Sequence, residues 1–290
     1  MVTTANTIAG KIARLRACRD FQRNPVRAVS ARLIWKWRWA VTNRPCTVKL
    51  AGTFNLSAPN SASACFMRSY GYSEPETARF VMRFLKPGMT FLDIGAHIGE
   101  YSLLAGRSVG PTGRVDAFEP QPAIFEFLSL NVTNSKLSNI SLHNQAIADR
   151  TGVVQMSLHS DPAKSSIGAL PSPADIITVP AITLDELLHT AGVSPNLIKV
   201  DAEGAERLIL KGAESLLALP KTTAPAWIME YDPDNCARFG YHPDELLRVF
   251  KMFEYATFWI TDSGELEPSS LPQPWYFGRN CVAVKQAPQL

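Results

Sequence analysis

Apolar and polar residues alternate with two different periods along this chain, and the change of period predicts strands and helices in turn. From Thr90 onward, short apolar runs typical of buried strands are followed by stretches with a helical period. The strands are expected at 90–94, 115–118, 139–147, 152–160, 174–184, 197–201, 226–231, 255–260 and 280–285. The helices are expected at 99–109, 123–135, 184–192, 204–219 and 244–253. Repeated strand–helix–strand units predict an α/β fold with a mostly parallel, doubly wound sheet.

The segment before this sheet has a shorter and more broken pattern. Two short strands are expected on either side of Gly52, followed by a loop at 58–64. A helix is expected from Ser73, because Ser73 and Glu76 have the spacing of a capping box and Pro75 lies in the first turn.

Charge divides the chain near residue 46. Residues 1–44 hold ten of the 29 basic side chains but one of the 26 acids, Asp20, so the rest of the chain has 19 basic and 25 acidic residues. We therefore predict a basic, tryptophan-containing N-terminal extension over 1–46, which would be an arm or a lid, and a main domain over 47–290.

The N-terminal extension contains two apolar patterns among its basic residues. The first, at 8–15, has helical spacing, whereas Trp35, Trp37 and Trp39 have the period of a strand, which would place three indoles on one face. We favour an arm that packs on the domain or on a second subunit of a homo-oligomer. A peripheral contact with an anionic membrane is the alternative, and we do not expect nucleic acid as the partner.

The composition is that of a globular protein from a reducing compartment. The 290 residues are 46% hydrophobic and 19% charged, and no apolar run reaches the roughly 18 residues of a spanning helix. The five cysteines are scattered without a CxxC or a Cys/His cluster, so we predict neither a disulfide framework nor a zinc site. We therefore expect a cytoplasmic protein.

Acidic residues end most of the predicted parallel strands, where ligands bind in such sheets. Asp93 follows the first strand, Glu119 the second, Asp201 the fourth and Glu230 the fifth, whereas 144–146 follow the third. An isolated buried carboxylate is costly and needs donors from the protein, a metal or a ligand. The sequence therefore predicts a ligand site at this edge of the sheet.

The stretch FLDIGAHIGEYSL, residues 91–103, indicates what that ligand is. Gly95 and Gly99 let a backbone approach closely, and Glu119 is placed to accept both hydroxyls of a ribose. The spacing is GxxxG rather than GxGxxG, and Asp93 would repel a pyrophosphate with no lysine or arginine nearby to compensate. S-adenosylmethionine has no phosphate and two cationic groups, so it suits an acid-lined pocket better than NAD. The alternative is that Asp93 only caps its own turn.

Four segments resemble the FkbM family of S-adenosylmethionine-dependent methyltransferases: FLDIGAHIGEYSL, VDAFEPQPAIFEFL, ITLDELL and, most specifically, IKVDAEGAERLILKGAESLL. The resemblance covers about 47–284 and implies a Rossmann-like class I methyltransferase fold that methylates hydroxyls of sugars or polyketide-type metabolites. His97 departs from it, since the family usually has asparagine there. The cofactor-binding residues that the resemblance implies are Asp93, Gly95, Ala96, Gly99, Glu119, Pro120, Gln145, Ala146 and Asp201. Glu119 would hold the ribose, and Asp201 would lie near the methionine end.

Methyl transfer to a hydroxyl needs a positioned acceptor oxygen and a base. Our candidate catalytic residues are Asp201 and Glu203, followed by His97 and Glu230. Each also has a structural interpretation: Asp201 can bind the cofactor's ammonium group, Glu230 can anchor a loop, and Glu206 can stabilise a helix start. Asp201, Glu203 and Glu230 would also suit magnesium or calcium. No metal-specific spacing supports that use, and we predict no metal.

The sequence thus predicts an S-adenosylmethionine-dependent O-methyltransferase with a small-molecule or glycan acceptor. Two other functions stay open. A noncatalytic S-adenosylmethionine-binding subunit would use the basic arm to contact a nucleic acid or a membrane, and an NAD-dependent oxidoreductase would bind nicotinamide. The choice of cofactor and the presence of turnover separate the three.

Overall fold

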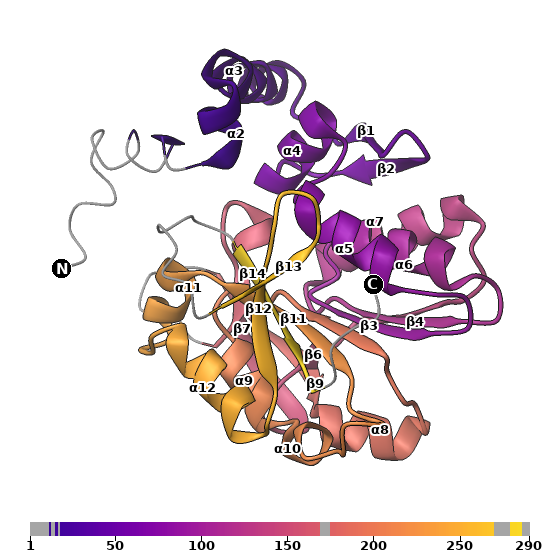
Figure 1. Cartoon of the computed structure of the whole chain (residues 1–290). Coiled ribbons are helices and arrows are strands. Elements are labelled where there is room, and N and C mark those ends of the chain that lie inside the picture. Colours follow the sequence, from indigo (N-terminus) through magenta and orange to yellow (C-terminus); the bar gives the residue numbers. More distant parts are fainter. Residues whose placement is uncertain (1–11, 13–14, 17, 169–174, 270–278, 286–290) are drawn as a thin grey trace.

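The computed structural model describes residues 12, 15–16, 18–168, 175–269 and 279–285 and has a central sheet with helices on both faces (Figure 1). In order across the sheet, its strands are β13 (Leu266–Pro268), β12 (Ala256–Ile260), β14 (Arg279–Val284), β11 (Ala226–Tyr231), β10 (Leu197–Val200), β3 (Thr90–Ile94), β4 (Arg114–Phe118) and β5 (Ile140–His143). The strands from β11 to β5 are parallel, and the other three pair antiparallel with their neighbours. This confirms the predicted α/β fold.

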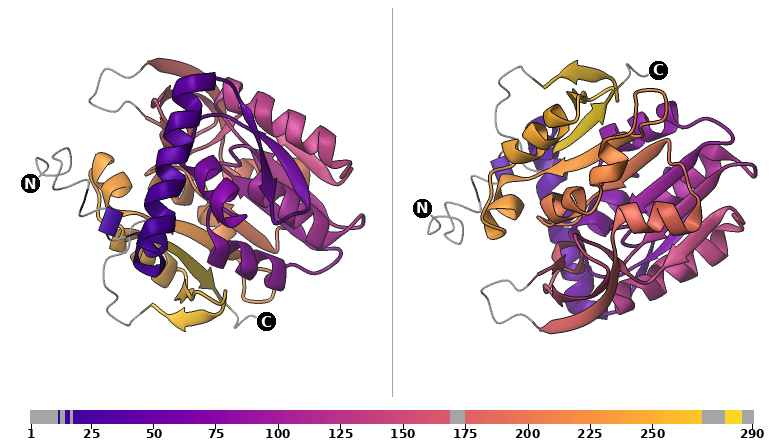
Figure 2. Two further views of the ribbon diagram at one scale, coloured as in Figure 1. Left: turned by 90° about the horizontal axis from the view of Figure 1, so that it is seen from above. Right: turned by 90° about the horizontal axis from the view of Figure 1, so that it is seen from below.

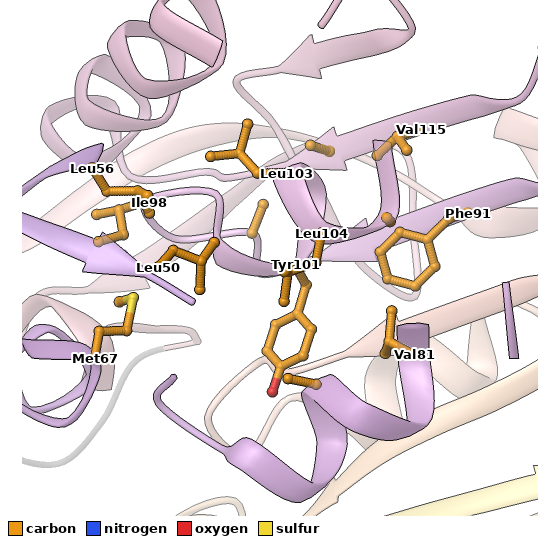
Figure 3. Packing of buried hydrophobic residues seen from close by; sticks show 14 of the residues in the cluster. Leu50, Leu56, Met67, Val81, Phe91, Ile98, Tyr101, Leu103, Leu104 and Val115 are labelled. Atoms are coloured by element: carbon orange, nitrogen blue, oxygen red, sulfur yellow. The ribbon is translucent and has the colours of Figure 1, made fainter. Parts of the chain in front are cut away.

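Two apolar clusters lie on opposite faces of the sheet, as the alternation of side chains along each strand requires. The first is covered by α5 (Pro75–Phe84), α6 (Glu100–Val109) and α7 (Pro122–Ser135). The second is covered by α8 (Leu184–Ala191), α9 (Glu206–Lys211), α10 (Glu214–Leu217) and α12 (Asp244–Met252). Phe91 packs in the first cluster with Val81 and Leu104 (Figure 3), and Leu92, the next residue, packs in the second.

The order of the strands creates a crevice at one edge of the sheet. The first strand of this sheet along the chain is β3, and β4 and β5 follow on one side of it. The next strand of the sheet, β10, lies on the other side of β3. In an open α/β sheet, connections that leave in opposite directions separate at the carboxyl ends of such neighbours, and ligands bind there. The carboxyl ends of β3 and β10 are therefore the place to look for a site.

A second, smaller sheet was not predicted. Its strands, in spatial order, are β6 (Ala146–Ile147), β9 (Ile176–Ile182), β7 (Gly152–Ser157) and β8 (Ser166–Ile167). The strand expected at 139–147 is in fact two strands, β5 and β6, because the side chain of Asn144 turns the chain by donating to the carbonyl oxygens of Glu119 and Pro120. The helix expected at 204–219 is also two, α9 and α10, which are separated at Gly212 and Ala213. Residue 212 must be glycine, because a Cβ there would lie 2.1 Å from the Ala148 carbonyl oxygen.

An N-terminal layer lies above the first cluster and consists of α2 (Arg19–Arg23), α3 (Pro25–Thr42), β1 (Cys46–Leu50), β2 (Phe54–Ala58) and α4 (Ala62–Tyr70). The strands around Gly52 are confirmed, whereas the loop expected at 58–64 contains the start of α4. The strand interpretation of Trp35, Trp37 and Trp39 is wrong, because all three lie in α3. Asn24 caps this helix by accepting from the Arg27 amide at 3.0 Å. The helical pattern expected at 8–15 lies mostly outside the described residues.

The N-terminal layer is tied to the sheet by polar contacts as well as by packing. The Asn131 side chain of α7 accepts from the Ser57 amide at 2.7 Å and donates to the carbonyl oxygens of Ser57 and Ile98. The capping box at Ser73 is wrong: its amide and hydroxyl both donate to the Glu100 carboxylate, and α5 begins at Pro75. Within the described ranges, no helix is long and apolar enough to cross a membrane.

Candidate active site

A cavity lies at the carboxyl ends of β4, β3, β10 and β11, where the crevice was expected. The predicted residues that line it are Gly95, Ala96, His97, Glu119, Pro120, Gln145, Ala146, Asp201, Glu203 and Glu230. The start of α4 and the chain between β7 and β8 complete its walls. Asp93 and Gly99 do not line the cavity. They lie buried in the structure that supports it.

Glu119 follows β4 and is held by two backbone amides. One carboxylate oxygen accepts from His97 N at 3.0 Å, and the other accepts from Gln121 N at 2.8 Å. Burial raises the pKa of Glu119 to about 7, although these two bonds oppose the change. A carboxylate offers about four lone-pair sites, so this one has capacity left for two hydroxyl donors. Glu119 therefore fits the role of binding a ribose.

Gly95 brings the loop after β3 against the turn after β10. Its φ is +80°, and a Cβ there would lie 1.9 Å from the Asp201 carbonyl oxygen, so glycine is required. Asp93 lies near the end of β3, before this loop, and its Oδ2 accepts a hydrogen bond from the Ser102 hydroxyl at 2.5 Å. Its Oδ1 is buried and has no partner within the described part of the chain. Gly99, with φ of +93°, begins α6.

Lys199 lines the cavity and was not predicted from the sequence. It lies in β10 and is 1% exposed, and its Nζ donates to Asp201 Oδ2 at 2.7 Å. The ammonium is also 4.5 Å from the centre of the Tyr101 ring. Burial lowers its pKa, but the charges of Asp201 and Glu74 outweigh burial and raise the pKa overall. The sequence feature that could have identified it is a lysine inside the apolar strand LIKV, two residues before an aspartate.

Two further carboxylates line the cavity and were also missed, the half-buried Glu74 and the buried Glu100. Glu74 precedes α5 and accepts from the Tyr101 hydroxyl at 2.8 Å and from Asn280 Nδ2 at 3.0 Å. Glu100 begins α6 and accepts from Ser73. Burial raises the pKa of each to about 7. Neither ends a strand, so the search at strand ends passed over both.

Asp201, Glu203 and Glu230 come together at the β10–β11 end of the cavity. Carboxylate oxygens of the three lie within 4.8 Å of one another. Asn235 Nδ2 joins two of them, donating to Glu203 at 2.7 Å and to Glu230 at 3.2 Å. Burial and the charge of Asp201 raise the pKa of Glu203 to about 8, although Arg238 opposes this. Burial and the charge of Glu203 raise the pKa of Glu230 well above its ordinary value.

The same three carboxylates have the chemistry of a hard-cation site. Their surroundings fit a hydrogen-bonded acid cluster better. Asn235 already places an N–H donor between Glu203 and Glu230, and Lys199 and Arg238 supply nearby positive charge. A divalent cation would have to displace or compete with these donors.

The remaining two residues, His97 and Glu206, differ in their hydrogen bonding. His97 lines the cavity, and its Nε2 is buried without a partner within the described residues. Burial lowers its pKa to about 4, so the ring is neutral near pH 7. Glu206 accepts from the amides of Ala202 and Gly204 and from the Tyr241 hydroxyl. Glu206 therefore holds the turn after β10, in agreement with its structural interpretation.

A family model described as the methyltransferase FkbM domain matches residues 93–257, more than half of the chain. The 31-O-demethyl-FK506 methyltransferase FkbM of Streptomyces tacrolimicus is 25% identical over 202 residues, which are 58% of this chain and 75% of that protein. The hexuronic acid methyltransferase AglP of Haloferax volcanii is 27% identical over 145 residues, which are 50% of this chain and 58% of that protein. Among solved structures, a precorrin-6y C5,15-methyltransferase from Geobacter metallireducens aligns with a TM-score of 0.45 and 13% identity, covering 74% of this chain and 89% of the other.

Proposed function

The chain belongs to the FkbM methyltransferase family, and we propose that it methylates a hydroxyl group of a sugar or small metabolite, with Glu203 as the general base. Methyl transfer from S-adenosylmethionine follows from the family. The names of two relatives, a 31-O-demethyl-FK506 methyltransferase and a hexuronic acid methyltransferase, support an oxygen acceptor on a metabolite or a sugar.

The observation that carries this proposal is the order of the cavity residues along the sheet edge. Glu119 lies at β4, the Gly95 loop at β3, Asp201 at β10 and Glu230 at β11. A cofactor whose ribose binds Glu119 would extend across β3 and place its cationic end near Asp201. When bound, S-adenosylmethionine supplies an electrophilic methyl group on a sulfonium. The β11 side, with Glu203 and Glu230, would then be left for the acceptor.

Glu203 is the best base among the candidate residues. Asp201 forms a 2.7 Å ion pair with Lys199, so its carboxylate already has a partner in the folded chain. His97, with a pKa of about 4, would hold a proton weakly. Glu203 has a pKa of about 8, which the positive charges of a bound cofactor would lower toward neutrality. A general base works best when its pKa is near the working pH.

Glu203 would take the hydroxyl proton while the acceptor oxygen forms its bond to the methyl carbon. The electrons of the breaking carbon–sulfur bond stay on sulfur, so charge and atoms balance. Asn235 would keep the Glu203 carboxylate in place through its 2.7 Å hydrogen bond. Exclusion of water by the buried walls would favour transfer to the acceptor over loss of the methyl group to solvent.

The test is methyl transfer from labelled S-adenosylmethionine to a panel of uronic acids, neutral sugars and hydroxylated macrocycles. Glu203→Gln should lower kcat by about 10² to 10⁴-fold, and Glu214→Gln, at an exposed position in α10, should leave it unchanged. Calorimetry should find similar cofactor binding in both variants. Wild-type turnover by Glu203→Gln would exclude this base. Cofactor binding without turnover on any acceptor would favour a noncatalytic subunit.

A further inference from the structure

Helix α3 turns a stripe of large apolar side chains toward solvent. Val26 is 78% exposed, Leu33 61%, Trp37 68% and Val41 65%, and Ile34 lies beside them at 56%. Their spacing of three, four or seven residues places them on one side of the helix. In the view from above in Figure 2, α3 lies at the front of the molecule and no described segment crosses in front of it.

The opposite side of α3 makes the contacts that fix the helix to the protein. Ala28 and Trp35 are buried, and Trp39 packs against the same cluster. The Trp35 indole nitrogen donates to Asn60 Oδ1 at 3.0 Å, just before α4. The exposed stripe is therefore not the face that holds the fold together. Within the described residues, nothing covers it.

Basic side chains dominate the charge around the stripe, and the acid that contacts α3 within the described residues is Asp20 of α2, which pairs with Arg32 at 2.5 Å. The 53 residues from Phe21 to Ser73 contain eight basic side chains and no acid. Around the helix, Lys36 borders one edge of the stripe, and Arg27 and Arg38 border the other. An apolar face edged by cations is typical of helices that lie in the interface of an anionic membrane.

We propose that α3 docks this enzyme on a bilayer surface that carries anionic lipid. A second copy of the chain would bring two cation-edged faces together, which like charges oppose. A nucleic acid would use the cations and leave the apolar stripe in water. A membrane satisfies both features: the stripe enters the boundary between headgroups and acyl chains, and the cations meet anionic headgroups.

Docking through α3 would also hold the cavity close to the membrane. Helix α4 packs against α3 on one side, and its residues Ala62, Ser63 and Met67 line the cavity on the other. One helix layer therefore separates the membrane-facing stripe from the cavity. An acceptor attached to a lipid would be within reach of the site.

The experiment is flotation of the full chain with vesicles of phosphatidylcholine alone or with about 30% phosphatidylglycerol, in low and high salt. We expect binding to the anionic vesicles that weakens with salt. Leu33→Glu and Trp37→Glu should each lower the partition coefficient about tenfold or more, and Lys36→Glu about fivefold or more. The matched control is Met252→Glu on α12, which is 77% exposed and should change nothing. Cofactor binding by each variant reports that it is folded.

Three results would overturn the proposal. The first is the absence of binding to anionic vesicles. The second is binding that Leu33→Glu leaves intact. The third is a dimer, seen by light scattering, that Leu33→Glu dissociates while vesicles bind neither form. An oligonucleotide that competes fully with vesicles for the wild type, but not for Lys36→Glu, would assign the surface to nucleic acid instead.

Discussion

The acid-lined cavity and the outward face of α3 depart from the usual distribution of side chains in opposite ways. The cavity buries Glu100 and Glu119 and half-buries Glu74 and Glu230, although proteins normally keep carboxylates in water. The α3 face exposes Leu33 and Trp37, which proteins normally bury. Both arrangements cost free energy in the isolated chain. We therefore propose a binding partner for each region: a cationic ligand for the cavity and an amphipathic membrane surface for the helix.

The two regions also differ in how their cost is compensated. The cavity is partly neutralised from within, because the positive charge of Lys199 interacts with the negative charges of Asp201, Glu74 and Asp93. The α3 stripe has no such internal compensation among the described residues. This difference predicts that substitutions in the cavity change stability strongly, whereas substitutions in the stripe change stability little.

The largest effect on stability is expected from Lys199→Met. Removing the buried ammonium leaves the neighbouring carboxylates without their cation, which costs about 3–5 kcal/mol in comparable buried pairs. Urea unfolding at pH 7 measures it. Lys211→Met is the control, because its side chain is 66% exposed and its ion pair with Asp149 is worth about 1 kcal/mol or less. A loss below 1 kcal/mol for Lys199→Met would show that the cavity does not depend on internal compensation.

The next effect is the dependence of stability on pH. Glu74, Glu100 and Glu119 have ordinary pKa values of 4.5 and values of about 7 in the folded chain. Between these values the folded chain binds more protons than the unfolded chain, so the stability that these three groups contribute falls as pH rises from about 4.5 to 7 and changes little above. Glu203, with a pKa of about 8, extends the fall to higher pH.

Glu100→Gln removes one of these titrations, keeps an acceptor oxygen for the Ser73 amide, and places an NH2 group that can donate to the Ser73 hydroxyl oxygen. At pH 8 it should raise the free energy of unfolding by roughly 1–3 kcal/mol, and at pH 4.5 the two proteins should be alike. Thermal unfolding at both pH values measures the difference. Equal gains at both pH values would mean that packing, not the carboxyl charge, is responsible.

A smaller effect is expected in the α3 stripe. Leu33→Glu should change the free energy of unfolding in water by no more than about 0.5 kcal/mol, because a surface substitution removes few contacts. Ala28 lies on the buried face of the same helix, and Ala28→Glu should prevent folding or cost several kcal/mol of folding free energy. If both variants were equally destabilised, the stripe would be part of the core.

No effect is expected from removal of divalent cations. Because Asn235, Lys199 and Arg238 already supply donors and charge to the acid cluster, EDTA should leave methyl transfer unchanged within about twofold. The assay uses wild type with an accepted substrate, with and without added magnesium. A loss that magnesium restores would assign Asp201, Glu203 and Glu230 to a metal.

The sheet and the cavity residues at the ends of its strands could be predicted from the sequence because their rules are local. An apolar run such as TFLDI predicts a buried strand from its own residues. The ends of two such strands give the positions of Asp93 and Glu119. Lys199, Glu74 and Glu100 could not be placed in this way. Their roles depend on contacts between segments far apart in the chain, as when Asn280 donates to Glu74.

The strand predicted at the α3 tryptophans is wrong for a different physical reason. Trp35, Trp37 and Trp39 have the spacing of a strand, yet Pro25 at the first turn and Asn24 at the N-cap begin a helix that continues through them. In that helix Trp37 is on the outer face, whereas Trp35 and Trp39 face the protein. Periodicity assumes that apolar residues are buried, and it fails where a surface exposes them.

The central claim is that the sheet edge divides the cavity into a cofactor half at Glu119 and an acceptor half at Glu203. Calorimetric titration with S-adenosylmethionine tests it without knowledge of the acceptor. We expect Glu119→Ala to weaken binding by about tenfold or more, since a carboxylate hydrogen bond contributes about 1.5–3 kcal/mol. Glu203→Gln should bind within about threefold of wild type. Unchanged binding by Glu119→Ala, or a loss confined to Glu203→Gln, would contradict this division.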